Sequence, residues 1–241
     1  MRSMRRLGGL CVAAALVAGL TACGSKSSGG SNSGGGGTGG PPTGPTPTNR
    51  SPSITAINVS PAFGVSGLTT FTMTGSASDP DGDALTLRWT FGGNTATGGA
   101  ATSTINGDGS ISVQFTATDS AGASASDSRT VTLGTMTGNW VVTVPFCNAS
   151  FSMTLSQTGG IVTGTFVMPV AFCAAVAGST GRTDPAEPGT IDAAGNVQIR
   201  LKVGAFLDFY VRGTMDATGR TVRGGVFNSG FNGQPMTMTK Q

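Results

Sequence analysis

The sequence predicts an all-β protein, a β-sandwich followed by a small antiparallel meander β-barrel. Apolar and polar residues alternate in many short segments, and residues typical of tight turns separate these segments. Residues 135–241 contain no segment with the 3.6-residue period of an amphipathic helix. We divide the chain into an export signal (1–22), a linker (23–50), a sandwich (51–134) and a barrel-like domain (135–241).

The first 22 residues have the pattern of an export signal. Arg2, Arg5 and Arg6 form a basic start, and an uncharged apolar run extends from Leu7 to Leu20. That run is shorter than the roughly 20 apolar residues that a transmembrane helix needs. We therefore expect residues 1–22 to be removed during export.

The signal ends in Leu20-Thr21-Ala22-Cys23, which resembles the lipobox of bacterial lipoproteins. The resemblance implies a diacylglycerol group on the Cys23 thiol, cleavage before Cys23 and acylation of the new amino terminus, as with palmitate. The alternative is an ordinary signal peptide cut after Ala22. Gly24, rather than the aspartate that favours inner-membrane retention, follows Cys23. The predicted location is therefore the cell envelope, lipid-anchored, with the outer membrane favoured over the inner one.

Residues 23–50 form a linker of Gly, Ser, Pro, Thr and Asn almost throughout. Such a composition cannot bury an apolar core. The Gly/Ser-rich first half is expected to be flexible and the Pro-rich second half stiffer. The linker would hold the folded domains away from the lipid surface.

Charge and composition exclude several classes of function. Arg2, Arg5 and Arg6 leave with the signal, so eleven of the 14 basic residues remain against 11 acidic ones. This balance argues against nucleic-acid binding, which requires a basic surface. The chain contains no histidine, which removes Ser-His-Asp and Cys-His catalysis and the commonest zinc ligand.

Two of the four cysteines remain for a disulfide. Cys11 lies in the signal and Cys23 in the lipobox, which leaves Cys147 and Cys173. An exported protein reaches an oxidising compartment, so we predict a bond between them. The alternative is a pair of buried thiols.

Residues 51–134 resemble the polycystic-kidney-disease-type (PKD) domain and its bacterial immunoglobulin-like relatives. The resemblance rests on the motifs at residues 78–83, 87–94 and 115–122, which read SDPDGD, LRWTFGGN and FTATDSAG. The family usually has acidic residues where this chain has Thr90 and Gly93. The resemblance implies a β-sandwich that serves as an extracellular spacer or adhesive module.

Asp79, Asp81 and Asp83 form a candidate metal site in the first of these motifs. Three carboxylates at alternate positions around a glycine can converge on a hard cation such as Ca²⁺. The spacing is not that of an EF-hand, because the glycine and the final glutamate are misplaced. The alternative is a solvated turn, in which Asp, Pro and Gly are favoured for backbone reasons. We expect no other cofactor.

Residues 135–241 alternate more regularly than the sandwich. Expected strands include residues 150–157, 196–203, 205–215, 220–227 and 235–240, and residues 170–177 are ambiguous. Gly138-Asn139-Trp140 resembles the Gly-x-Trp that opens lipocalin and avidin-type barrels. The resemblance implies a basic residue packed on Trp140, for which Lys240 is best placed and Arg223 is the alternative.

The sequence favours a membrane-anchored, surface or periplasmic lipoprotein that acts as a non-enzymatic binding or adhesion module. Its partners would be the membrane, through the lipid anchor, and an unknown protein, glycan or small apolar ligand. One alternative is a lipocalin-like barrel that binds a small ligand and stands on a structural spacer. Another is a carboxylate-dependent hydrolase, whose acids would be drawn from Asp184, Glu187, Asp192 and Asp208.

Overall fold

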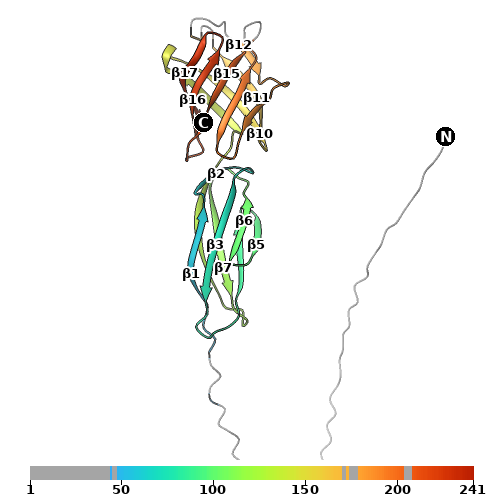
Figure 1. Ribbon diagram of the computed structural model, residues 1–241, viewed down its shortest axis with the longest axis vertical. Coiled ribbons are helices and arrows are strands. Elements are labelled where there is room, and N and C mark those ends of the chain that lie inside the picture. The colour runs from blue at the N-terminus through green and yellow to red at the C-terminus, as the bar shows by residue number, and fades with distance from the viewer. Residues whose placement is uncertain (1–43, 45–47, 170–171, 174–178, 204–207) are drawn as a thin grey trace, which may run out of the picture. The chain divides into compact units, whose positions relative to one another are not determined.

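The computed structural model describes residue 44 and residues 48–169, 172–173, 179–203 and 208–241 (Figure 1). The predicted signal, Cys23 and nearly all of the linker lie outside these residues, so the lipoprotein assignment stays a prediction. The described part is built from β-strands and one short 3₁₀ turn, η1 (Pro145–Cys147), which confirms the all-β prediction. It contains no helix that is long and apolar enough to span a membrane.

The first domain is a sandwich of two sheets (Figure 1). One sheet has the order β1 (Ser53–Ser60), β3 (Thr70–Ser78), β6 (Ala100–Thr104). The other has the order β2 (Phe63–Val65), β8 (Ser124–Gly134), β7 (Gly109–Thr118), β4 (Thr86–Phe91), β5 (Asn94–Thr97). All pairings are antiparallel except the one between β2 and β8.

Alternation along the strands places the sandwich core between the two sheets. In β4 the apolar Trp89 and Phe91 are buried, whereas Thr86, Arg88 and Thr90 are exposed. The Trp89 ring packs against Phe115 of β7, with ring centroids 4.7 Å apart. Paired sheets with aromatic side chains between them are typical of immunoglobulin-like sandwiches.

The second domain is a closed, eight-stranded antiparallel barrel. Its elements are β9 (Gly138–Val144), β10 (Ala149–Thr158), β11 (Ile161–Met168), β12 (Ser179–Arg182), β13 (Gly189–Ile191), β14 (Asn196–Leu201), β15 (Phe209–Met215), β16 (Thr221–Asn228) and β17 (Phe231–Lys240). β9 pairs with both β10 and β17, and β10 also pairs with β11, which closes the ring. β12 and β13 pair with successive parts of β11 and so share one place in the wall.

Two hairpin turns of the barrel are each closed by a glycine in the left-handed region. In the turn that begins at Asp192, the carboxylate Oδ1 accepts the N–H groups of Ala194 and Asn196, each at 2.9 Å. Gly195 there adopts a φ of 85°, which L-residues with a side chain rarely reach. The turn that begins at Asp216 is closed in the same way by Gly219, so both fix the register of their strands.

The interior of the barrel is filled by side chains. Inward residues alternate along every long strand and are almost fully buried, as Met153, Ile199 and Val211 illustrate. Phe151, Phe172, Phe209 and Phe231 form a further cluster of ring contacts. Small eight-stranded barrels are either filled in this way or hold one ligand, and here side chains occupy the interior.

A disulfide joins Cys147 of η1 to Cys173, as the sequence predicts. The two Cα atoms are 5.0 Å apart, within the usual range for a disulfide. The bond links the β9–β10 connection to the segment that follows β11. Phe172, the neighbour of Cys173, is buried in the barrel core.

Candidate functional site

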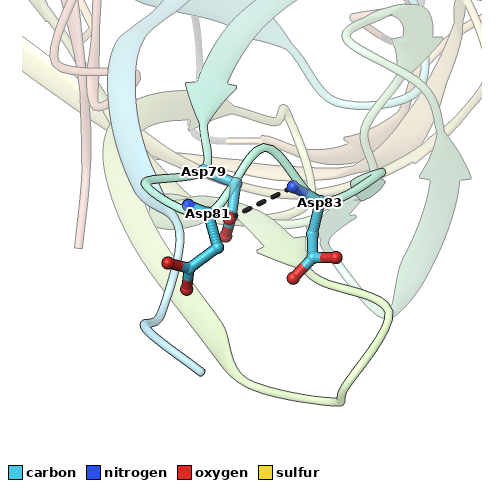
Figure 2. A group of neighbouring side chains, drawn as sticks. All are labelled: Asp79, Asp81 and Asp83. Carbon is cyan, nitrogen blue, oxygen red and sulfur yellow. Dashed lines mark hydrogen bonds between the residues drawn. The ribbon is translucent and has the colours of Figure 1, made fainter. Parts of the chain in front are cut away.

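The three predicted calcium ligands lie in the loop between β3 and β4 (Figure 2). Carboxylate oxygens of Asp79, Asp81 and Asp83 lie within 4.8 Å of one another. Asp79 Oδ1 accepts the backbone N–H of Asp81 at 2.8 Å and that of Asp83 at 3.3 Å. Asp79 Oδ2 is buried and has no hydrogen-bond partner in the described part of the chain. The loop is therefore an Asx-type turn with one unshared carboxylate oxygen.

The other two carboxylates already have partners. Asp81 accepts hydrogen bonds from the backbone N–H of Arg50 at 2.7 Å and from its Nε at 2.8 Å. The side-chain hydrogen bond from Arg50 lowers the pKa of Asp81. Ser120 Oγ donates to Asp83 Oδ1 at 3.0 Å. A cation here would face the Arg50 guanidinium, so these contacts favour a turn closed by Arg50 over a preformed calcium cage.

Replacing Asp79 by alanine is expected to destabilise the sandwich by about 1–2 kcal/mol, because two backbone N–H groups lose their acceptor. Thermal unfolding of the full chain with calcium and with EDTA measures this loss. If the loop is a turn without a metal, the loss of stability should be equal in both buffers. Asp79→Asn keeps an acceptor oxygen and is the milder control. A calcium-dependent rise in Tm that Asp79→Ala abolishes would instead establish the metal site.

Lys240 packs on Trp140, as the resemblance to Gly-x-Trp barrels implies. Its Nζ lies 5.9 Å from the centroid of the indole ring, and the lysine is 8% exposed. Trp140 is fully buried, and its Nε1 donates to the carbonyl oxygen of Met136 at 2.8 Å. The alternative, Arg223, is exposed on β16 opposite Thr214.

Three of the four acids considered for a hydrolase converge on Arg200 of β14. Its guanidinium pairs with Asp184, Glu187 and Asp208. The hydrogen bond with Asp208 contributes most to the raised pKa of Arg200, and the hydrogen bond with Glu187 follows. The carboxylates are thus held by a shared cation. A glycosidase-like pair would instead face each other across a cleft.

Asp184 is the most deeply buried member of this group, at 1% exposed. The backbone N–H of Ala186 donates to Asp184 Oδ1 at 2.9 Å and is the main reason that the pKa of Asp184 is lowered. Lys202 lies 3.5 Å from the same carboxylate. The fourth acid, Asp192, is held in its own turn by the side-chain amide of Asn196 and by backbone N–H groups, and these hydrogen bonds lower its pKa. Both acids are therefore bound as carboxylates.

A groove of about 540 Å³ lies on the outer, solvent-facing side of the barrel wall over β13 to β16. The register places Gln198 of β14, Arg212 of β15 and Gly225 of β16 in one row across the sheet. Gln198 and Arg212 are exposed, and Gly225 contributes no side chain. Other side chains along the groove are those of Thr190, Asp192, Asn196, Thr214 and Phe227.

Arg212 lies across two aromatic rings beside this groove. Its guanidinium carbon is 5.0 Å from the centroid of Tyr210 and 5.3 Å from that of Phe227, which are opposite each other on β15 and β16. In the described part of the chain Arg212 has no acidic partner. The arrangement can bind a polar or negatively charged group, and it is the functional feature that the sequence reasoning missed.

The glycines of β16 are the signal in the sequence that could have indicated this groove. A Cβ atom at Gly225 would lie 3.1 Å from the carbonyl oxygen of Gly233, so a larger residue would press on β17. A Gly-Gly pair inside a strand, directly after the outward Arg223, marks a place where the outer face lacks side chains.

Comparisons with known proteins identify the first domain. The family model of the PKD domain matches residues 49–133. No curated protein matches the chain. A solved structure, described as concerning the promiscuous specificity of carbohydrate-binding modules from the β-sandwich superfamily, is 15% identical and covers 80% of this chain and 91% of that chain. Its TM-score of 0.35 does not establish a shared fold. Residues 49–133, which the PKD model matches, form the two-sheet sandwich described above.

Proposed function

We propose that this chain is a lipid-anchored, non-enzymatic binding module of the bacterial cell envelope. In this proposal the PKD-type sandwich is a spacer and the outer groove of the barrel is the binding surface. The observation that carries it is Arg212, which two rings hold beside an open groove and which forms no ion pair with any acid that the structure describes. The ion pairs that engage Asp184, Glu187 and Asp208 support a binding role over hydrolysis.

The barrel interior is the other place where a ligand could bind, and its packing favours the groove. Buried side chains occupy the interior, including Phe172, Phe151 and Ile199. A ligand inside would have to displace such groups, each of which contributes about 1.5–3 kcal/mol when fully buried. The outer groove is open without any rearrangement.

The anchor is tested by replacing Cys23 with serine and growing the cells with labelled palmitate. We expect the unaltered protein to incorporate the label and Cys23→Ser to lack it, because the Cys23 thiol is the predicted lipidation site. Separation of the inner and outer membranes of cells with the unaltered protein then tests the expected outer-membrane location. A Cys23→Ser protein that still incorporates labelled palmitate would refute lipidation at this residue.

The groove is tested by filling it. Gln198 is exposed and lines the groove, so Gln198→Trp is expected to abolish most binding of residues 24–241, which lack the predicted signal and lipidation site, to envelope fractions from the host. Gln114 is also exposed, on β7 of the sandwich, and Gln114→Trp is the matched control. If Gln198→Trp and Gln114→Trp bind envelope fractions equally well, the groove is not the binding surface. Both variants must first be shown to unfold at the same temperature as the unaltered protein.

A further inference from the structure

We infer that the groove on the outer face of β13 to β16 binds an acidic glycan, a hydroxyl-rich chain bearing carboxylate or sulfate groups. Arg212 would hold the anionic group. This inference rests on the proposed function, since it names the ligand of the same groove. Three features of the groove support it: uncompensated charge, a fixed guanidinium and free hydrogen-bonding side chains.

The first feature is the charge around the groove. Arg212 and Arg223 lie on the outer face of neighbouring strands and are diagonal neighbours, because Arg212 is opposite Gly225 and Arg223 is opposite Thr214. Neither arginine pairs with an acid in the described residues. Arg200, on the same face of β14, has three carboxylate partners. The Asp192 carboxylate also lines the groove, where the N–H groups of its own turn and the side-chain amide of Asn196 hold it. Arg212 and Arg223 are thus cations beside the groove that no acid of the described residues neutralises by an ion pair.

The second feature is the way Arg212 is held. Stacking over the rings of Tyr210 and Phe227 restricts its long side chain before any ligand arrives. A guanidinium fixed in this way loses less entropy when it binds, and its planar fork matches the two oxygens of a carboxylate or sulfate. The rings thus prepare Arg212 for an anion that approaches from solvent.

The third feature is the set of polar side chains around the groove. Gln198, directly opposite Arg212, and Thr190, opposite Gln198, have no side-chain hydrogen bond in the described part of the chain and can bind hydroxyl groups. Asn196 and Thr214 are already bonded to each other. Among the described residues that line the groove, Ile191 and Val197 are buried, and the half-buried ring of Phe227 is the large apolar side chain on the outer face.

These features favour a glycan over a protein segment. Protein interfaces are usually anchored by several large apolar or aromatic side chains in well-packed pockets. The exposed side chains at the groove are amides, hydroxyls, the Arg212 guanidinium and the Asp192 carboxylate, all of which can bind hydroxyl groups. A volume of about 540 Å³ also lies within the range of small-ligand sites.

The test is a titration of residues 24–241, which lack the predicted signal and lipidation site, with three polysaccharides. We expect alginate, which carries carboxylates, or dextran sulfate to bind, and neutral dextran not to bind. Which polyanion binds more tightly distinguishes a carboxylate from a sulfate ligand. EDTA in every buffer prevents calcium from gelling the alginate. Added salt should weaken the binding, because the charges are exposed to solvent.

Arg212→Gln is expected to weaken polyanion binding by about tenfold or more, which is the loss of one charge-assisted contact. Arg212→Lys keeps the charge but loses the fork, so we expect it to restore only part of the affinity. Arg88→Gln makes the same change of charge at an exposed position on the sandwich and should have no effect. Unchanged thermal unfolding of each variant shows that the fold is intact.

Two results would overturn the inference. If Arg88→Gln weakens polyanion binding as much as Arg212→Gln does, the attraction is non-specific. If neutral dextran binds as tightly as the polyanions, the groove does not recognise negative charge. If no polysaccharide binds while Gln198→Trp still abolishes envelope binding, the acidic-glycan inference fails and the proposed function stands. If envelope binding does not depend on the groove, the proposed function fails as well.

Discussion

Replacing Trp140 by alanine is expected to lower the free energy of unfolding of the barrel by about 3–5 kcal/mol. The indole of Trp140, on β9, is fully buried, and the Lys240 ammonium packs over its ring. Its loss would leave a cavity, and the carbonyl oxygen of Met136 would lose the hydrogen bond from Nε1. Few single substitutions in this chain remove as much buried contact.

Urea unfolding of the full chain measures this loss. The chain has two tryptophans, and the variant keeps Trp89, whose fluorescence reports on the sandwich. Circular dichroism follows the barrel and the sandwich together. Trp140→Phe retains an aromatic ring and should lose less than Trp140→Ala. A Trp140→Ala barrel that unfolds within about 1 kcal/mol of the unaltered one would contradict its place in the core.

Removing the disulfide by replacing Cys147 and Cys173 with serine is expected to destabilise the barrel by about 3–4 kcal/mol. The cysteines are 26 residues apart, and in the chain-entropy model a closed loop of this length restricts the unfolded state by that amount. The barrel should also lose the restraint on the segment that carries Phe172.

Mass spectrometry without reductant first verifies the bond, since an oxidised pair does not react with an alkylating agent. Urea unfolding then compares the double variant with the oxidised protein and with the protein under reducing agent. The double variant and the reduced protein should agree. Two alkylated thiols in protein purified from the envelope would refute the disulfide.

Long alternating strands could be predicted from the sequence, including which side chains face inward. The strands β10 and β14 are examples, because their apolar residues repeat every two positions over at least six residues. The strands β2, β5 and β6 could not, since each has five residues or fewer and no clear apolar alternation. Their place comes from pairing with neighbours that are distant in sequence.

The binding groove depends on register in the same way. Gln198, Arg212 and Gly225 are separated by more than ten residues at each step, and only the pairing of β14, β15 and β16 puts them in one row. The same holds for the acids near Arg200, where Asp208 joins Asp184 and Glu187. Short-range motifs therefore identify turns, as at Asp192, better than they identify sites.

The closure of the barrel by its first and last strands also bears on how its chain can be rearranged. β17 pairs with β9, and the N–H of Gln241 donates to the carbonyl oxygen of Asn139 at 3.0 Å. The two ends of the domain are therefore neighbours, so a short peptide could join them and new termini could open at the exposed Gly159 turn between β10 and β11. Such a circular permutant would keep every strand pairing of the ring.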